Sequence, residues 1–504
     1  MDLSIFDKGA FAPCPAPFNL AQHVLAAGAK TPDKIALSIV SLTQAETWTY
    51  AQLTAAILGT ATGLLQSGLH PGDILLMRLG NSVDFPIAYL GAIAAGIVPV
   101  PTSSQLTDIE VAKILGQLSP AAILLGDGIA CPKTEIPTYR SDIYEAWHSL
   151  APADFDQGDP DRLAYIIFTS GTSGTPRAVG HAHRAIWARQ MMMDGWYALR
   201  SDDVLLHAGA FNWTYTLGTG LMDPWTKGAT ALIPAAGTDP AQMPLLLHQN
   251  KVSIFAAAPG VYRQVLKFPI PDLPDLRHGL AAGEKLSSAI RDHWRDAAKT
   301  EIFEAYGMSE CSTFISSAPD RPLVPGTLGR PQTGRHIAIT DETGQPVPFD
   351  QEGIIAVHKA DPGLMLGYIG AEQATRDKFA ADWFLTGDRA SMSPDGDITY
   401  LGRADDMMNA GGYRVSPLEV EAALNDLPGV IELAVTDIAV KNDVRLIAAF
   451  YTSKDQLDEK TLASVAASRL ARYKCPRSFI RIEAMPKNPN GKLLRSQLKD
   501  MAQG

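Results

Sequence analysis

The chain has 504 residues, of which 46% are hydrophobic and 19% are charged, and its formal net charge at pH 7 is −11. Single hydrophobic cores stop growing at roughly 250–300 residues, so this length and composition predict more than one folded domain and exclude a disordered chain. The acidic balance supplies no general basic field, which disfavours a nucleic-acid partner.

No targeting segment is visible in the sequence. Residues 1–8 lack the basic and apolar regions of a signal peptide, and prolines and glycines interrupt the longest apolar run, residues 85–101. We therefore expect neither a leader nor a membrane span. The cysteines lie far apart without metal-ligand spacing, which is typical of reduced thiols in a cytoplasmic protein. They are Cys14, Cys131, Cys311 and Cys475.

The first 125 residues alternate between two periodicities. Apolar residues at helical spacing predict helices, and short apolar runs between turn residues predict strands. The predicted helices cover residues 18–25, 51–65, 84–95 and 109–118, and the predicted strands cover residues 34–40, 72–79, 97–101 and 121–125. This alternation indicates βαβ units, a largely parallel sheet and the α/β class.

A polar loop follows the predicted strand at residues 163–167. Residues 168–177 read Phe-Thr-Ser-Gly-Thr-Ser-Gly-Thr-Pro-Arg, with five hydroxyl side chains, two glycines and one cation. Hydroxyl and backbone N–H groups donate well to phosphate oxygens, so this loop is a candidate polyphosphate site. It is not a Walker A loop, because Pro176 and Arg177 stand where that motif has glycine and lysine. An ordinary solvated turn is the alternative.

The alternation resumes after this loop. Strands are expected at residues 204–207, 229–233 and 253–256, with helical segments at 217–225 and 243–250. Residues 279–284 and 301–310 each read as a strand that ends in a turn bearing an acid. Beyond residue 325, short strands separated by Gly/Pro turns indicate a β-rich subdomain that closes near residue 401.

The last hundred residues form a predicted small domain. Polar residues 402–406 and the pair Gly411 and Gly412 mark its start, and residues 417–470 carry their own βαβ pattern. A basic run occupies the end of the chain; it is usually a solvated face, and contact with an anionic substrate is the alternative. Its members are Arg469, Arg472, Lys474, Arg477, Arg481, Lys487, Lys492, Arg495 and Lys499.

Seven segments, in this order and spacing, resemble the adenylate-forming (ANL) superfamily of acyl-CoA synthetases, peptide-synthetase adenylation domains and luciferases. The resemblance runs from about residue 30 to the end and is strongest to medium-chain acyl-CoA and aryl-CoA (benzoate-CoA-like) ligases. Any one segment alone is a weak signal, whereas the ordered set is very specific. The segments are residues 168–177, 282–284, 306–310, 383–388, 402–406, 411–417 and 486–492.

The resemblance implies two half-reactions. A carboxylate attacks the α-phosphate of ATP and releases pyrophosphate, and a thiol, usually that of coenzyme A, then displaces AMP from the acyl-adenylate. Such chemistry needs charge neutralisation at an in-line phosphoryl centre and the exclusion of water. The cofactors implied are ATP, Mg²⁺ and coenzyme A, and the partner is a small-molecule carboxylic acid.

The resemblance also implies roles for individual residues in the nucleotide site. Tyr306 would stack on adenine, with an ordinary core tyrosine as the alternative; Asp388 would accept bonds from the ribose, with a turn residue as the alternative. Ser309 would bind the α-phosphate, and Glu310 would hold Mg²⁺. The remaining implied nucleotide contacts are Thr169, Ser170, Gly171, Thr172, Ser173, Gly174, Arg177, Gly283, Glu284 and Arg403.

The small domain would contribute the remaining catalytic parts. Lys492 would bridge the carboxylate and the α-phosphate, since lysine is a compact charge. A rotation about Asp405 would then replace Lys492 with the segment Gly411, Gly412 and Arg414, where residues without side chains can line a narrow thiol tunnel. The implied architecture is an N-terminal domain over residues 1–402, a hinge over 403–406 and a mobile α+β domain over 407–504.

The chain departs from the family pattern at two places. Arg177 stands where most relatives have lysine, and residues 437–445 form a shorter segment than in many ligases, which leaves the contact with coenzyme A open. Gly307 replaces the tryptophan of acetate-selective relatives, so a longer or aromatic acyl group is expected. Trp213 and Tyr215 match the segment that borders the acyl pocket in relatives, with core packing as the alternative.

The sequence therefore predicts an ATP- and Mg²⁺-dependent acid–thiol ligase that makes an acyl- or aryl-CoA. A freestanding enzyme that loads a carrier protein is the first alternative, and a nucleotide-binding sensor is the second. Complete catalytic residues argue against a sensor: Glu310, Asp388 and Lys492 are all present. The particular acid and a homodimer are left open.

Overall fold

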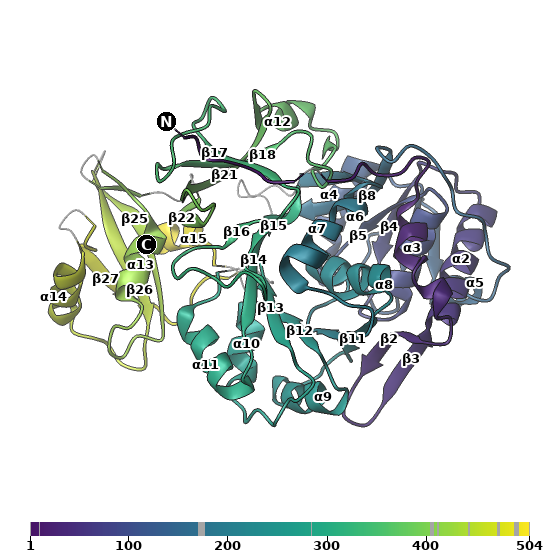
Figure 1. Ribbon diagram of the computed structural model, residues 1–504, viewed down its shortest axis with the longest axis horizontal. Coiled ribbons are helices and arrows are strands. Elements are labelled where there is room, and N and C mark those ends of the chain that lie inside the picture. Colours follow the sequence, from purple (N-terminus) through teal and green to yellow (C-terminus); the bar gives the residue numbers. More distant parts are fainter. Residues whose placement is uncertain are drawn as a thin grey trace. The chain divides into compact units, whose positions relative to one another are not determined.

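The computed structural model describes residues 2–9, 11–169, 177–283, 285–403, 408–410, 413–441, 444–470, 474–487 and 493–502 (Figure 1). By compactness the chain divides into two units. The larger comprises Phe6–His336 and His358–Phe379, and the smaller comprises Met1–Ile5, Ile337–Val357 and Ala380–Gly504. The predicted boundary at residues 402/403 falls within the smaller unit and stays a prediction.

A nine-stranded sheet forms the centre of the larger unit in its described residues. Six adjacent strands run parallel at its centre, and antiparallel strands complete the two edges, one at one edge and two at the other. The order is β16 (Arg330–Pro331), β15 (Ser312–Ser316), β14 (Ile302–Met308), β13 (His278–Ala282), β12 (Ile254–Ala257), β10 (Val204–His207), β11 (Thr230–Pro234), β2 (Ile35–Val40) and β3 (Ala45–Thr49). In Figure 1 the labels β14, β13, β12, β11, β2 and β3 follow one another in this order. The predicted parallel sheet is confirmed.

Two further sheets belong to the larger unit. A parallel sheet has the order β5 (Val98–Pro101), β4 (Ile74–Arg78), β6 (Ala122–Leu125) and β7 (Thr138–Arg140). An antiparallel sheet has the order β19 (Gly367–Tyr368), β9 (Arg177–Ala182) and β8 (Leu163–Thr169). The hairpin of β8 and β9 brackets the candidate phosphate loop.

Helices cover these sheets. The α-helices are α1 (Leu20–Leu25), α2 (Tyr50–Gln66), α3 (Asp84–Ala94), α4 (Asp108–Leu118), α5 (Ser141–Trp147), α6 (Ala185–Ala188), α7 (Gln190–Met192), α8 (Asp223–Lys227), α9 (Met243–Gln249), α10 (Pro259–Val265), α11 (Ser288–Ala298) and α12 (Glu372–Arg376). Short 3₁₀ helices are η1 (Gly28–Lys30) and η4 (Pro240–Gln242), and π-helices are η2 (Met193–Tyr197) and η3 (Thr216–Met222).

The longest of these helices shows why the local sequence folds as it does. Thr49 caps α2 by accepting a bond from the backbone N–H of Gln52, whose side chain in turn accepts from the N–H of Thr49. This reciprocal capping box satisfies donors that helix starts leave unpaired. Leu53, Ile57 and Leu64 are then fully buried in the core that α2 shares with α3. Spacing along the sequence therefore sets which face of α2 is buried.

Residues 217–225 are helical as predicted, but in two pieces. The π-helix η3 ends at Met222 and α8 starts at Asp223, with Pro224 in its first turn. Gly218 and Gly220 form α-helix poorly, and proline suits a helix start, which explains a break at this point. Within the described residues, none of the helices combines the length and the apolar character that a membrane span would need.

The smaller unit contains three described sheets. The first has the order β1 (Ile5–Asp7), β17 (His336–Thr340), β18 (Gly353–His358), β21 (Trp383–Met392) and β20 (Phe379–Ala380), with β22 (Ile398–Arg403) paired to β21. In β1, β17, β18 and β20, one or two residues at one end are assigned to the larger unit. The second is β23 (Met408–Ala410) with β24 (Tyr413–Val415), and the third is β25 (Glu432–Lys441), β26 (Val444–Thr452) and β27 (Ser478–Arg481). Helices α13 (Pro417–Leu424), α14 (Glu459–Arg469) and α15 (Arg495–Met501) complete the unit.

Two predictions for the smaller unit are confirmed. Short strands do form a β-rich subdomain that closes at β22, and the parallel strands β26 and β27 enclose α14 as a βαβ unit. The sequence did not indicate that β1, at the start of the chain, adds an edge strand to the β-rich sheet. A three-residue strand is too short to show periodicity.

Candidate active site

Residues near the two ends of the candidate phosphate loop pair with each other in an antiparallel hairpin. Thr169, the last residue of β8, pairs with Arg177, the first residue of β9. Ser170, Gly171, Thr172, Ser173 and Gly174 lie outside the described residues, so their predicted phosphate contacts stay predictions. The sequence correctly placed a strand directly before the loop.

Arg177 is held against an aromatic ring that the sequence did not single out. Its guanidinium carbon lies 4.9 Å from the ring centroid of Tyr368, on β19, which pairs with β9. A guanidinium over an aromatic face gains a cation–π attraction, and its planar shape suits such stacking better than a lysine ammonium does. The ring of Tyr368 therefore stabilises an arginine at position 177 better than it would stabilise a lysine.

Tyr368 also contacts the predicted metal ligand. Its phenol donates a hydrogen bond of 2.7 Å to Oε1 of Glu310, which is buried. Burial, together with the nearby Glu310 carboxylate, raises the pKa of Tyr368 above its ordinary value, so the phenol keeps its proton and remains a donor. A charge-assisted bond of this kind fixes the orientation of the carboxylate.

The turn after β14 carries Ser309 and Glu310, and its backbone is anchored at both residues. The imidazole Nε2 of His181 lies 2.7 Å from the carbonyl oxygen of Ser309, and the N–H of Met365 donates to the carbonyl of Glu310 at 2.7 Å. Burial lowers the pKa of His181 to about 4, so its ring is neutral and Nε2 carries the hydrogen. The neutral tautomer is thus set by the carbonyl it faces.

A buried ion pair contacts Ser312, the first residue of β15, just after this turn. Arg189 donates from Nε to Oδ1 of Asp223 at 2.7 Å and from Nη2 to Oδ2 at 2.6 Å. Its Nη1 donates to the hydroxyl of Ser312 at 2.6 Å, and the phenol of Tyr197 donates to the same carboxylate at 2.7 Å. Because Asp223 neutralises Arg189, the guanidinium can remain charged in the interior.

A second buried pair supports the next residue of β15. Arg335 donates to Asp361 at 2.6 Å and to the carbonyl oxygen of Thr313 at 3.1 Å, and both charged side chains are fully buried. The thiol of Cys311 lies 3.8 Å from the same carboxylate. Together the two pairs fix residues 311–313 directly after Glu310, a support that no local sequence pattern indicates.

Tyr306 and Gly307 lie at an irregularity between β14 and β15. The ring of Tyr306 is half-buried and packs edge-on against Phe314, with 5.3 Å between centroids. A Cβ on Gly307 would lie 2.1 Å from the carbonyl oxygen of Ser312, so this close approach of β15 requires glycine. Gly307 therefore has a packing reason beside its predicted role in the acyl pocket, and both predicted roles remain predictions.

Gly283 and Trp213 bring two predicted groups of residues together. Gly283 has φ +93°, which favours glycine, and a Cβ there would lie 3.3 Å from Cζ2 of Trp213. The neighbouring Glu284 lies outside the described residues. The predicted nucleotide-binding turn after β13 thus adjoins a predicted acyl-pocket residue.

Trp213 and Tyr215 belong to one aromatic cluster. Their ring centroids are 5.1 Å apart, and the ring of His207 lies 4.4 Å from that of Tyr215. The ring of Trp196 stacks on that of Tyr215, with 6.1 Å between the centroids. The structure therefore joins both predicted pocket residues and adds His207 and Trp196, which the sequence did not indicate.

Asp388 in the smaller unit is a buried carboxylate with donors around it. It pairs with Arg403 across β21 and β22, and the Arg403 Nε lies 3.7 Å from its Oδ1. The phenol of Tyr400 donates to the same oxygen at 3.0 Å. Such a carboxylate suits the predicted acceptance of ribose hydroxyls, which stays a prediction.

Several predicted residues cannot be placed. Asp405, Gly411, Gly412 and Lys492 lie outside the described residues. Only the backbone of Arg414 is described; it lies in β24 and pairs with Asn409 of β23. In the basic C-terminal run, five described side chains form ion pairs with acidic residues, and contact of this run with an anionic substrate stays a prediction. The pairs are Arg469–Asp426, Lys474–Glu419, Lys487–Glu432, Arg495–Glu421 and Lys499–Asp437.

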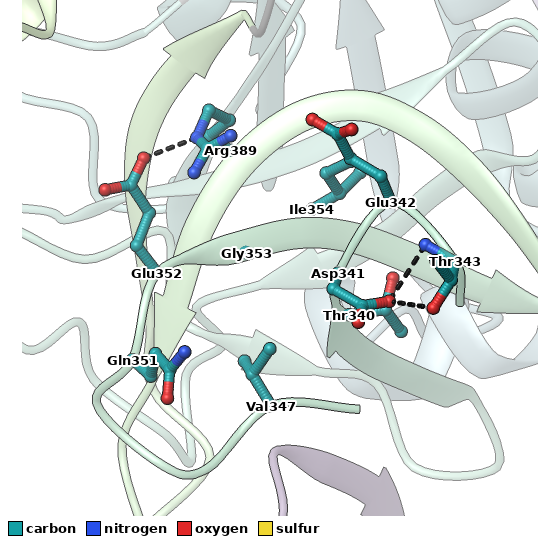
Figure 2. Close-up of a pocket in the computed structure, with 10 residues that line it drawn as sticks. All are labelled: Thr340, Asp341, Glu342, Thr343, Val347, Gln351, Glu352, Gly353, Ile354 and Arg389. Carbon is teal, nitrogen blue, oxygen red and sulfur yellow. Dashed lines mark hydrogen bonds and ion pairs between the residues drawn. The ribbon is translucent and has the colours of Figure 1, made fainter. Parts of the chain in front are cut away.

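A separate hollow of about 400 Å³ lies on the smaller unit, between the turn after β17 and the start of β18 (Figure 2). Its polar groups bond to one another: Asp341 accepts from Thr343, and Arg389 pairs with Glu352. Since successive strand residues point to opposite faces, Arg389 lies on the other face of β21 from Asp388. This hollow is therefore not part of the predicted ribose site.

The residues present fit a magnesium ion held mainly by substrate. Magnesium usually takes one or two protein carboxylates and completes its shell with phosphates and water. Within the described part of the chain no cluster of three or more metal-binding side chains exists. Glu310, a single carboxylate oriented by the same Tyr368 that contacts Arg177, has the chemistry of such a partial site.

Comparison with known proteins identifies matches over almost the whole chain. The family model for AMP-binding enzyme matches residues 24–369, and the model for AMP-binding enzyme C-terminal domain matches residues 419–492. The 3-hydroxybenzoate–CoA/4-hydroxybenzoate–CoA ligase of Thauera aromatica is 28% identical, with 90% of this chain and 92% of the relative covered. The human mitochondrial acyl-coenzyme A synthetase ACSM2A is 27% identical, with 96% and 91% covered.

A solved structure agrees with these matches. The benzoate CoA ligase from Burkholderia xenovorans LB400 superimposes with a TM-score of 0.83 at 26% identity, and the match covers 96% of this chain and all of that one. Agreement over this length supports the same arrangement of sheets and helices as described above. It therefore supports the α/β class predicted from the alternation of elements.

Proposed function

The chain belongs to the AMP-binding enzyme family of the adenylate-forming superfamily, and we propose that it joins a carboxylic acid to coenzyme A at the expense of ATP. In the first step a carboxylate oxygen attacks the α-phosphorus of ATP, and the bond to pyrophosphate breaks. In the second step the thiol sulfur attacks the acyl carbon of the acyl-adenylate, loses its proton, and AMP leaves.

The observation that carries this proposal is the anchored turn at Ser309 and Glu310. Phosphoryl transfer depends on groups already fixed where charge develops. Bonds from His181, Met365 and Tyr368 fix this turn at both its backbone and its carboxylate. We assign Ser309 to the α-phosphate and Glu310 to Mg²⁺, which would neutralise phosphate charge when bound.

The other residues act in binding and orientation. Arg177, fixed on Tyr368, supplies positive charge at the end of the candidate phosphate loop. Tyr306 offers a half-buried ring to adenine, and Asp388 offers a buried carboxylate to the ribose. Lys492 neutralises the carboxylate and α-phosphate, and rotation about Asp405 then presents Gly411 and Gly412 to the thiol; these roles rest on the family resemblance.

The acyl group of the substrate is a medium-length or aromatic one. Trp213 and Tyr215 present large rings, and these favour a substrate with apolar bulk over acetate. The relatives are named as acyl-coenzyme A synthetases and hydroxybenzoate–CoA ligases, so loading of a carrier protein is the less favoured alternative. The requirement for magnesium, a cytoplasmic location and a homodimer remain proposals.

The test is carboxylate-dependent exchange between ATP and labelled pyrophosphate, across a panel of aliphatic and aromatic acids. Exchange with at least one acid, followed by AMP and thioester formation when coenzyme A is added, is expected. The Glu310→Gln variant, which keeps the size of the side chain but removes its charge, should lose exchange. A complete absence of exchange across the panel would refute the proposal; transfer only to a purified carrier protein would favour the alternative.

A further inference from the structure

One face of the central sheet presents three alanines and one histidine near the carboxyl ends of its strands. The register aligns His207 on β10 with Ala256 on β12 and aligns Ala282 on β13 with Ala305 on β14. All four side chains lie on the face that packs against the aromatic cluster. In parallel sheets, ligands bind just beyond the carboxyl ends of the strands, and alanine leaves room there.

The aromatic cluster adjoins this end of the face. Tyr215 contacts His207, Trp213 and Trp196, and Trp213 in turn reaches the turn at Gly283. The family resemblance assigns that turn to the nucleotide. The cluster is therefore on the acyl side of the position at which carboxylate and ATP would react.

Two polar atoms in this cluster have no hydrogen-bond partner within the described chain. They are the phenol oxygen of Tyr215 and Nε2 of His207. His207 is fully buried and Tyr215 is 9% exposed, so bulk water does not compensate either atom. An unpaired buried polar group is costly, and two of them on adjacent rings indicate a site that a ligand completes.

The protonation states define what such a ligand must offer. Burial lowers the pKa of His207 to about 3 and raises the pKa of Tyr215 well above its ordinary value, so both rings are neutral. The Thr216 hydroxyl lies 3.3 Å from Nδ1 of His207; when it donates, Nε2 carries the hydrogen. The two atoms then provide one N–H donor and one phenol that both donates and accepts.

We propose that Tyr215 and His207 determine substrate specificity by binding a hydroxyl group on an aromatic carboxylic acid. This inference rests on the proposed ligase function and narrows its substrate class. A phenolic hydroxyl accepts one hydrogen bond and donates another, which matches the donor on His207 and the phenol of Tyr215. The surrounding rings of Trp196 and Trp213 favour an aromatic over an aliphatic skeleton.

The chemistry predicts strong discrimination. A site built to hydrogen-bond a substrate hydroxyl rejects the analogue that lacks it, because the site's own polar groups are then left unpaired. We expect kcat/KM for 3-hydroxybenzoate or 4-hydroxybenzoate to exceed that for benzoate by roughly 100-fold or more. Hexanoate, which has neither ring nor hydroxyl, should be poorer still.

The experiment compares three proteins on these four acids: the unaltered chain, Tyr215→Phe and Tyr262→Phe. Tyr215→Phe removes only the unpaired hydroxyl and should reduce the hydroxybenzoate-to-benzoate ratio of kcat/KM at least tenfold. Tyr262→Phe is the matched control, since that buried phenol already donates to the carbonyl of Phe255. It should lower the unfolding midpoint without changing the ratio.

His207→Phe provides an independent second variant, because it replaces the imidazole with a ring that has no polar atom. It should lower the same ratio. The inference is overturned if benzoate or hexanoate is preferred, or if Tyr215→Phe keeps the ratio of the unaltered chain. Absence of pyrophosphate exchange with every acid would instead refute the ligase function itself, so the two failures are distinguishable.

Discussion

The phenol of Tyr368 donates a hydrogen bond to the carboxylate of Glu310, with 2.7 Å between the oxygens. The same ring lies beneath the guanidinium of Arg177, at the end of the candidate phosphate loop. One tyrosine thus connects the cation of that loop to the predicted magnesium ligand. We therefore expect a change at Arg177 to affect Glu310, and a change at Glu310 to affect Arg177.

Removing the phenol oxygen should weaken the orientation of Glu310. Tyr368→Phe keeps the ring under Arg177 but loses the bond to the carboxylate, and a hydrogen bond to a charged group contributes about 1.5–3 kcal/mol. We expect the magnesium concentration for half-maximal pyrophosphate exchange to rise roughly tenfold or more. Tyr139→Phe, on β7, is the control and should leave it unchanged. An unaltered magnesium dependence in Tyr368→Phe would contradict the connection.

The identity of the cation at position 177 should matter less than its presence. Arg177→Lys keeps the charge but loses the planar stack on Tyr368, so KM for ATP should rise only a few-fold. Arg177→Met removes the charge and should raise KM for ATP by roughly ten- to a hundred-fold, as expected for losing a charge-assisted contact with phosphate. Steady-state kinetics at saturating acid would measure both. If Arg177→Met and the unaltered chain had equal KM values for ATP, a role of Arg177 in phosphate binding would be excluded.

The buried pair of Arg189 and Asp223 should be essential for stability. Removing one partner leaves the other charge buried without compensation, so Asp223→Asn should lower the free energy of unfolding by about 3–5 kcal/mol. The exposed pair of Arg295 and Asp292 is the comparison, and Arg295→Ala should cost less than about 1 kcal/mol. Urea denaturation followed by tryptophan fluorescence would give both values, and similar losses would disagree with this account.

The two half-reactions should separate at Lys492. If this lysine neutralises the carboxylate and α-phosphate only during adenylation, Lys492→Ala abolishes pyrophosphate exchange. It should still form thioester from supplied acyl-adenylate and coenzyme A at close to the normal rate. Single-turnover assays of each step would decide, and a matching loss in both steps would show that Lys492 serves the whole cycle.

Acidification should destabilise the fold through its buried histidines. Burial lowers the pKa from 6.5 to about 4 in His23, His181 and His278, and to about 3 in His183 and His207. The unfolded chain takes up these protons below pH 6.5 while the folded chain does not, so their contribution to stability is complete above pH 6.5 and is lost as the pH falls towards 4. Each histidine adds a slope of up to about 1.4 kcal/mol per pH unit.

The measurement is the urea unfolding free energy at pH 7.5, 6 and 5. His183→Asn is informative, because His183 Nδ1 accepts from the N–H of Leu20 at 3.0 Å and the asparagine oxygen can take over that role without titrating. Its stability should decline less steeply with falling pH. Identical slopes for the two proteins would show that His183 does not contribute.

Much of the fold followed from the sequence, because local patterns carry it. The alternation of helical and strand periodicity predicted the parallel sheet, and the strand at residues 302–308 was expected to end in the turn that bears Glu310. Ten of the predicted site residues fall outside the described residues: Ser170, Gly171, Thr172, Ser173, Gly174, Glu284, Asp405, Gly411, Gly412 and Lys492. For these the sequence remains the sole basis.

The sequence by itself determined the α/β class, the order of the elements and the ordered set of family segments. Periodicity and motif spacing depend on residues a few positions apart, so they can be read from the chain directly. Only the tertiary structure decided which distant side chains meet: Tyr368 with Glu310, Arg189 with Asp223, and Tyr215 with His207 and Trp196. Such contacts arise when packed elements bring remote residues together, and they leave no periodic trace in the sequence.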